Sequence, residues 1–307
     1  MFSPPLPKLL VRPVGRDKEY AKRIPLFSMR WSAPLTTNVH FISGLPRSGS
    51  TLLSALLRQN PRFAASVTSP VASLWGATIP GMSGASEFSS FFCDSNKSAI
   101  LRGIFDGYYV HDNDKDVIFD TNRLWTARAS LLANIYPNSM IICCVRPVGW
   151  IIDSIEKILR QNPLHTSRVF DFKPGSNVYG RADILMNSDR GLVGLPWSSL
   201  REACFSDQAH RLILINYETL ARHPARVVQQ IYEAIREPIY PHRFDQVEFD
   251  QHLYDADLGM PGLHKVMDTV KFVARDPCIP PEIFAKYEGC EFWLRPEFSD
   301  TRATMIL

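Results

Sequence analysis

Short runs of apolar residues alternate along the chain with stretches in which apolar residues recur every three or four positions. The runs predict buried β-strands, and the periodic stretches predict amphipathic helices. Strands are expected near Val39, Val117, Ser139 and Leu212, and helices at the end of 39–60 and over 97–110, 125–136, 148–159, 197–210 and 217–236. The remaining parts, 80–98, 163–196 and the chain from Pro238 onward, are predicted to be less regular, with 163–196 as a lid or substrate loop.

Strands that alternate with helices predict an α/β fold, in which helices flank a parallel sheet. Ligands bind such sheets at the carboxyl ends of the strands. The segments that follow the expected strands are therefore the candidates for a site: Gly44–Thr51, Asp120–Arg123, Arg146–Gly149 and Asn216–Glu218.

The segment Gly44–Thr51 reads Gly-Leu-Pro-Arg-Ser-Gly-Ser-Thr and stands between a strand and a helix. Backbone N–H groups of such a turn, together with the positive end of the helix dipole, form a phosphate cradle. The spacing is that of the nucleotide-binding P-loop, but Ser50 stands where that motif has lysine,. Arg47 adds a planar fork of donors for oxyanions, and Ser48, Ser50 and Thr51 add hydroxyl groups.

A second candidate follows the strand that ends at Val145. Arg146 comes directly after this strand, and Ser154 lies eight residues further on, about two turns into the expected helix,. An arginine and a serine on one face, both near the carboxyl end of a strand, are suited to hold a second phosphate.

Together these two segments resemble the PAPS-dependent sulfotransferase family. A third likeness is Ile215-Asn-Tyr217-Glu218-Thr-Leu220, which is similar to the strand-end Tyr-Glu-x-Leu of that family. The three motifs stand in the family's order over about residues 38–235, and the form of the first loop resembles that of bacterial enzymes related to protein-tyrosine sulfotransferases.

The resemblance implies a three-layer sulfotransferase sandwich with a P-loop-like parallel sheet. It implies transfer of a sulfuryl group from PAPS to a hydroxyl or phenol acceptor, with a tyrosine-containing peptide as one candidate. The 5′-phosphosulfate would lie on Arg47, Ser48, Gly49, Ser50, Thr51 and Leu52, while Arg146 and Ser154 would hold the 3′-phosphate and Tyr217 would contact the cofactor. No metal is expected, because arginines and backbone donors stand in place of a magnesium–lysine pair.

The residues at the positions of the family's lysine, histidine and glutamate differ in this chain, so the general base is not assigned by the resemblance. The family commonly has lysine after the second strand, and its cytosolic members add a histidine there, whereas this chain has Asp120-Thr-Asn-Arg123. Protein-tyrosine members use a glutamate after the first helix, where this chain has Ser66-Val-Thr-Ser69. The candidate bases are, in order, Asp120, His264 and His111.

The surroundings of two of these candidate bases bear on the interpretation. Arg123 either replaces the missing lysine or forms a salt bridge with Asp120. His264 belongs to the glycine-rich segment Gly259–Lys265, which could close over the cofactor with Lys265 on a phosphate.

Two other functions remain open at this point. One is a P-loop kinase or NTPase, because the segment Val117–Asp120 is similar to the strand and aspartate that hold magnesium in such enzymes. Against it, Ser50 stands in place of the lysine that such enzymes place on the β- and γ-phosphates,. A catalytically inactive protein that binds phosphorylated ligands fits the missing lysine and glutamate.

Charge and composition narrow the partners and the compartment. A net charge of +3 with pI about 8.5 suits a small anionic ligand and does not suggest a nucleic-acid partner,. The chain has no apolar stretch of about 18 residues, so no transmembrane segment is expected,. Six cysteines without a Cys-x-x-Cys motif indicate a reducing, cytoplasmic setting,.

We expect residues 1–37 to be a proline-rich N-terminal extension and residues 38–307 to be the sulfotransferase domain. The loops at 70–98, 163–196 and 240–275 are expected to shape the acceptor pocket. The sequence carries no prediction of the oligomeric state.

Overall fold

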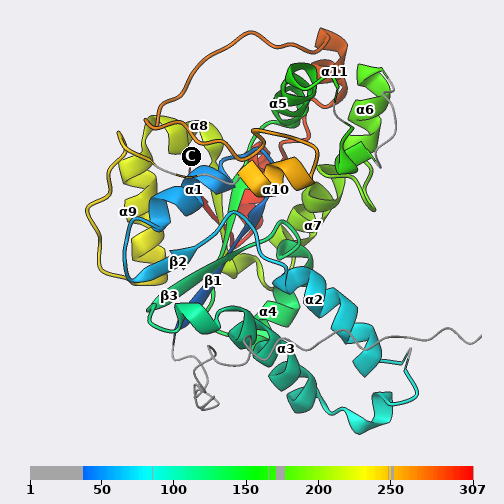
Figure 1. The fold of residues 1–307 in the computed structure, drawn as a ribbon, viewed down its shortest axis with the longest axis vertical. Helices are drawn as coiled ribbons and strands as arrows, with labels where there is room; N and C mark the ends of the chain where they lie inside the picture. Colours follow the sequence, from blue (N-terminus) through cyan, green and yellow to red (C-terminus); the bar gives the residue numbers. More distant parts are fainter. Residues whose placement is uncertain are drawn as a thin grey trace, which may run out of the picture. The chain divides into compact units, whose positions relative to one another are not determined.

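A parallel sheet of six strands organises residues 35–307, which form one compact unit (Figure 1). The structure is a computed structural model, and it describes residues 37–84, 86–164, 166–170, 177–247, 249 and 252–306. The predicted N-terminal extension lies outside the described residues, apart from Thr37. Within the described residues, no helix combines the length and the apolar character needed to cross a membrane.

The strand order across the sheet is β2-β3-β1-β4-β5-β6, and every neighbouring pair is parallel. The strands are β1 (Asn38–Gly44), β2 (Phe63–Ala65), β3 (Val117–Thr121), β4 (Ile141–Val145), β5 (Leu212–Asn216) and β6 (Thr304–Ile306). The four central strands confirm the prediction. The sequence analysis missed β2 and β6, which are three-residue strands at the two edges of the sheet.

Neighbouring residues of each strand enter two separate cores, as the two-residue period of a strand requires. In β4, for example, Ile141, Cys143 and Val145 belong to one core, while Ile142 and Cys144 belong to the other. Both faces of β4 are buried, and this strand is apolar throughout,.

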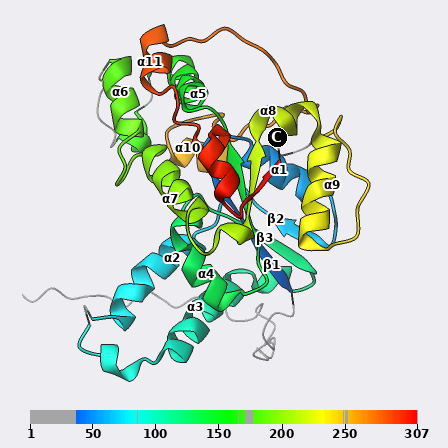
Figure 2. The same cartoon turned by 180° about the vertical axis from the view of Figure 1, so that it is seen from behind.

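Helices α1 (Ser50–Leu57), α8 (Tyr217–Arg222) and α9 (Pro224–Ile235) supply the second core. The first core takes side chains from α2 (Val71–Thr78), α3 (Asp94–Tyr108), α4 (Ala129–Ile135), α5 (Val148–Gln161), α6 (Val178–Leu185), α7 (Gly194–Cys204) and α11 (Pro281–Lys286). Figures 1 and 2 show α1 and α9 on one side of the sheet and α4 and α7 on the other. The fold is therefore the predicted three-layer α/β arrangement.

Shorter elements complete the described chain. Helix α10 comprises His252–Asp257. The 3₁₀ turns are Ile79–Met82, Ser89–Phe91, Val110–Asp112, Thr126–Arg128, Arg168–Phe170, Ala209–Arg211, Phe292–Leu294 and Pro296–Asp300.

Several predicted helix boundaries were wrong. The helix expected over 217–236 is divided into α8 and α9, because Pro224 lacks a backbone N–H and His223 before it is not helical,. The helix expected over 197–210 begins three residues earlier, as α7, and ends at Cys204.

Other elements were not predicted at all. Helix α6 lies inside the segment 163–196, which the sequence analysis expected to be irregular, and the side chain of Asn177 caps its first turn,. Helices α2, α10 and α11 were also missed.

Candidate active site

The loop between β1 and α1 has a backbone conformation that depends on its glycines. Gly44 and Gly49 have φ of 94° and 97°, a left-handed region that favours glycine,. A Cβ atom on Gly44 would lie 2.4 Å from the carbonyl oxygen of Cys144, so the loop also requires close contact with β4. Arg47 adopts φ of 56°, which is unusual for a residue with a side chain,. The loop holds Arg47 in this conformation at the start of α1.

A cavity of about 1400 Å³ lies at the carboxyl ends of the strands,. Residues after four strands line it, namely Pro46, Arg47, Gly49, Ser50, Thr51, Leu52, Thr121, Asn122, Arg123, Arg146 and Tyr217. Segments of the expected lid region and of 240–275 complete the wall. No described residue of 70–98 lines this cavity, although that segment was predicted to shape the acceptor pocket.

Arg47, Arg146, Ser154 and Tyr217 come together beside this cavity. The guanidinium Nε of Arg47 donates to Ser154 Oγ at 3.2 Å, and Nη1 of Arg146 donates to the carbonyl oxygen of Arg47 at 3.4 Å. The guanidinium of Arg146 lies over the ring of Tyr217, 4.5 Å from its centroid. Ser154 is not among the cavity-lining residues and acts through Arg47 in this structure.

Neither Arg47 nor Arg146 forms an ion pair with a carboxylate among the described residues. Burial, and next the positive charge of Arg146, lower the pKa of Arg47 to about 10. Burial likewise lowers the pKa of Arg146. Two neighbouring cations in a partly buried position repel each other, and an anionic ligand would compensate both charges.

The other residues predicted for the phosphate loop have different surroundings. Gly49 is the N-cap of α1, and Ser50, Thr51 and Leu52 form its first turn at the cavity. Ser48 is fully buried, does not line the cavity, and donates its hydroxyl to the carbonyl oxygen of Pro46 at 3.2 Å. The position of Ser48 gives it a role in shaping the loop.

His264 and Asp255 form a hydrogen-bonded pair. His264 Nδ1 lies 2.5 Å from Asp255 Oδ1, and the backbone N–H of His264 donates to Asp255 Oδ2 at 2.9 Å. Burial lowers the pKa of His264, the hydrogen bond and charge of Asp255 raise it, and the charges of Arg47 and Arg123 lower it further. A proton on Nδ1 leaves Nε2 as the basic atom of a neutral imidazole.

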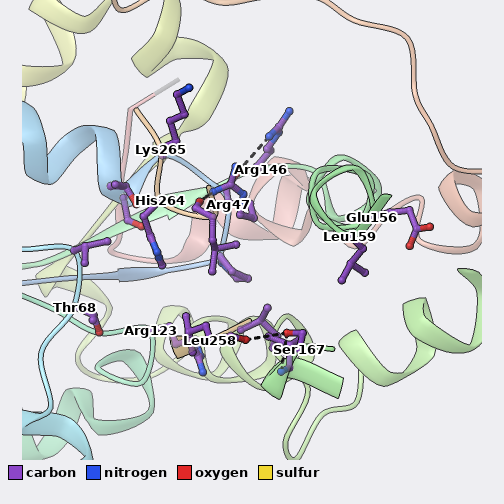
Figure 3. Close-up of a pocket in the computed structure, with 18 of the residues that line it drawn as sticks. Arg47, Thr68, Arg123, Arg146, Glu156, Leu159, Ser167, Leu258, His264 and Lys265 are labelled. Carbon is purple, nitrogen blue, oxygen red and sulfur yellow. Dashed lines mark hydrogen bonds between the residues drawn. The ribbon is translucent and has the colours of Figure 1, made fainter. Parts of the chain in front are cut away.

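The segment Gly259–Lys265 places this histidine at the cavity (Figure 3). Arg47 Nη1 donates to the carbonyl oxygen of Leu263, the residue before His264, so the phosphate loop and the histidine loop are joined directly. Lys265 also lines the cavity. The sequence analysis missed Asp255, because it belongs to a helix of only six residues, α10, and lies nine positions before the histidine that it contacts.

Asp120, the first candidate for the base, has a different environment. Its side chain is fully buried and does not line the cavity. It accepts hydrogen bonds from Trp125 Nε1 at 2.7 Å, from Ser69 Oγ at 2.6 Å and from the Tyr109 hydroxyl at 2.9 Å. The alternative salt bridge between Asp120 and Arg123 is absent from the described ion pairs, and Arg123 instead faces the cavity. These contacts give Asp120 a structural role at the end of β3.

His111, the third candidate, is exposed in the 3₁₀ turn Val110–Asp112, which precedes β3. This turn leads into the amino end of the strand, whereas the cavity lies at the carboxyl ends. Among the described residues, no group of three or more His, Cys, Asp or Glu side chains is arranged to hold a metal ion.

A model of the sulfotransferase family matches residues 40–241. The chain belongs to this family. The matched part contains the phosphate loop, Arg146, Ser154 and Tyr217, whereas Asp255 and His264 lie beyond it. A comparison with curated proteins found no match.

Solved sulfotransferase structures are similar to the chain at low sequence identity. A sulfotransferase domain from the curacin biosynthetic pathway is 16% identical with a TM-score of 0.51, and the alignment covers 86% of this chain and 95% of that one. A sulfotransferase from Alicyclobacillus acidocaldarius is 16% identical with a TM-score of 0.46, and that alignment covers 72% of this chain and 89% of that one. The first likeness supports the fold described above.

Proposed function

We propose that this sulfotransferase uses PAPS as donor and transfers the sulfuryl group to a hydroxyl or phenol acceptor. The observation that carries the proposal is the pair Arg47 and Arg146, two neighbouring guanidinium groups without a carboxylate partner among the described residues, at the cavity and beside the first turn of α1. Such a pair at a helix N-terminus fits a ligand with more than one anionic group.

The donor set is suited to PAPS at two places. Arg47 and the first turn of α1, with Ser50 and Thr51, would hold the 5′-phosphosulfate. Arg146 and Lys265 would hold the 3′-phosphate. The ring of Tyr217 packs against the guanidinium of Arg146, and Ser154 accepts a hydrogen bond from the guanidinium of Arg47.

His264 is the base in this proposal, with Asp255 as its orienting partner. Nε2 would take the proton of the acceptor hydroxyl while the acceptor oxygen bonds to sulfur and the bond from sulfur to the bridging phosphate oxygen breaks. Arg47 would stabilise the negative charge that develops on the leaving oxygen. The hydrogen bond from Arg47 to the carbonyl oxygen of Leu263 supports this assignment, because it links the loop that carries the cation to the loop that carries the proposed base.

The acceptor class includes a tyrosine-containing peptide, as the sequence resemblance implied. The six cysteines are all free thiols, and they fit a cytoplasmic setting.

Transfer of label from PAPS carrying ³⁵S to a panel of phenols, alcohols and tyrosine peptides tests the proposal. Thermal unfolding with adenosine 3′,5′-bisphosphate, ATP or no ligand is the accompanying binding assay. We expect stabilisation by the bisphosphate and label transfer that excess chelator does not abolish. Stabilisation by ATP alone, with activity that requires magnesium, would favour a kinase, and bisphosphate binding without transfer to any acceptor would indicate an inactive binder.

A further inference from the structure

Positive charge is in large excess around the cavity. Nine arginine and lysine side chains line it, and two carboxylates, Glu156 and Asp183, accompany them. Both carboxylates are already paired: Glu156 with Arg160 and Arg181, and Asp183 with Lys286. The remaining cations exceed what one phosphate group needs, so their distribution over the cavity walls is informative.

Four of these cations lie on two sides of the cavity. Figure 3 shows Arg47, Arg146 and Lys265 on one side of the open space and Arg123, with Leu258 and Ser167, on the other. The ring of His264 projects into the space between them. The electrostatic contacts agree, because the charges of both Arg47 and Arg123 lower the pKa of His264. The charges that shift the pKa of Arg47 are those of Arg146, Tyr217, Asp255 and Arg275, and Arg123 is not among these residues.

Arg123 has no carboxylate partner among the described residues. Its side chain is exposed to the cavity, yet surrounding protein atoms lower its pKa. The one neighbouring group that favours its charged form is Tyr254, whose ring lies 5.5 Å from that of His264. A guanidinium in this position offers up to five donors and no acceptor, which suits a carboxylate or another planar or tetrahedral anion.

The cavity also has an apolar lining. Leu258 lies on the side of Arg123 and Leu159 lies near Glu156 (Figure 3), and Leu164, Val169, Phe170 and Leu192 are further lining residues. A ligand with an apolar body and a terminal anion would therefore match this cavity better than a neutral polar one.

We propose that the acceptor carries an anionic group in addition to its hydroxyl, and that Arg123 binds this anion. The acceptor would span the cavity with its hydroxyl at His264 Nε2, its anion at Arg123 and its apolar body along the leucine side chains of the lining. This inference rests on the proposed function, and it names the class of acceptor as a hydroxy acid or an acidic hydroxyl-bearing peptide.

Matched acid and amide ligands test this proposal directly. The pairs are para-hydroxyphenylacetate with its amide, omega-hydroxyhexanoate with its amide, and the peptides acetyl-Asp-Tyr-Asp-amide and acetyl-Asn-Tyr-Asn-amide. Calorimetric titration of each into protein saturated with adenosine 3′,5′-bisphosphate measures acceptor binding without turnover, and the bisphosphate keeps acids out of the cofactor site.

We expect at least one acid to bind about tenfold or more tightly than its amide. In Arg123→Gln this preference should disappear, while Arg123→Lys should keep part of it and the exposed control Arg243→Gln should keep it in full. Both Arg123 variants should bind the bisphosphate as the wild type does, which reports that they are folded. The pair that shows the preference identifies the source of the anion as a small acid or an acidic peptide.

Three results would overturn the inference: no acid binds, acids and amides bind equally, or the preference survives in Arg123→Gln. If Arg123 instead contacts the transferred sulfuryl group, Arg123→Gln should lower the turnover of acid and amide acceptors by the same factor and leave the ratio of their affinities unchanged. Failure of the proposed function is distinguishable, because the wild-type protein would then either not bind the bisphosphate or bind it without transferring label from PAPS to any acceptor.

Discussion

At the scale of single residues, Arg47 connects the phosphate loop with the loop that carries His264. Its side chain contacts Ser154 and the carbonyl oxygen of Leu263, and its backbone carbonyl accepts from Arg146. Arg47→Ala should lower kcat by about 10²-fold or more, because a positioned cation no longer stabilises the transition state. Steady-state kinetics with labelled PAPS measures this effect. The exposed Arg58→Ala is the matched control, and near wild-type turnover of Arg47→Ala would contradict the assigned role.

The pair His264 and Asp255 makes a prediction about pH. Asp255 raises the pKa of His264, so Asp255→Asn should lower that pKa and shift the acidic limb of the rate profile to lower pH,. The plateau rate should fall as well, because the imidazole loses the group that fixes its tautomer. A pH profile of kcat measures both effects, and His264→Gln should remove the limb. An unchanged limb in Asp255→Asn would show that this carboxylate does not act on the base.

The sequence predicted the position of some residues of the site and not of others, for physical reasons. Arg47 and Arg146 follow strands within local motifs, so their positions could be inferred from neighbouring residues. Asp120 also ends a strand, but a strand-end side chain can face either the cavity or the core, and its three donors come from Ser69, Tyr109 and Trp125. Only the tertiary structure shows that choice, and only it brings Asp255 to His264.

At the scale of elements, the connection between β4 and α5 carries Arg146, which the proposed function assigns to the 3′-phosphate. Arg146→Gln should weaken binding of adenosine 3′,5′-bisphosphate by about ten- to a hundredfold, since a charge-assisted hydrogen bond contributes about 1.5–3 kcal/mol. Binding of adenosine 5′-monophosphate should change little. Titration calorimetry of both nucleotides measures the difference, with the exposed Arg201→Gln as control. Equal losses for the two nucleotides would mean that Arg146 supports the loop rather than the 3′-phosphate.

The end of β3 depends on Asp120. Asp120→Asn should cost about 1–3 kcal/mol of unfolding free energy, because an amide cannot accept all three hydrogen bonds that the carboxylate accepts,. Affinity for the bisphosphate should stay near the wild-type value. Urea unfolding and nucleotide titration measure the two quantities. A variant of full stability with no turnover would instead return Asp120 to the list of candidate bases.

The elements themselves were predictable where their pattern is local. The four central strands contain short apolar runs, and α5 has a strongly amphipathic sequence, so both could be predicted from the pattern of apolar positions,. The edge strands β2 and β6 have three residues each, and pairing with β3 and β5 stabilises them rather than their own pattern. The same holds for α10, whose six residues are too few to form a stable helix alone,.

At the scale of the whole molecule, His40 links the stability of the sheet to pH. Its ring lies buried in β1 beside Phe119, and its Nδ1 accepts the backbone N–H of Met140 at 3.0 Å, one residue before β4. Burial, and next the charge of Arg211, lower the pKa of His40 to about 4. The folded sheet therefore favours the neutral form of His40, and protonation of His40 destabilises the fold.

The sign of the effect follows from linkage. Between pH 6.5 and pH 4 the unfolded chain binds a proton at His40 and the folded chain does not, so stability falls as pH decreases through this range,. From pH 7 to pH 5 this residue should account for a loss of about 2 kcal/mol. His40→Asn keeps an acceptor for Met140 but cannot titrate, so its stability should fall less over the same interval. Urea unfolding at the two pH values measures the difference, with exposed His111→Asn as control. Equal losses in His40→Asn and wild type would show that acid acts on the fold through other groups.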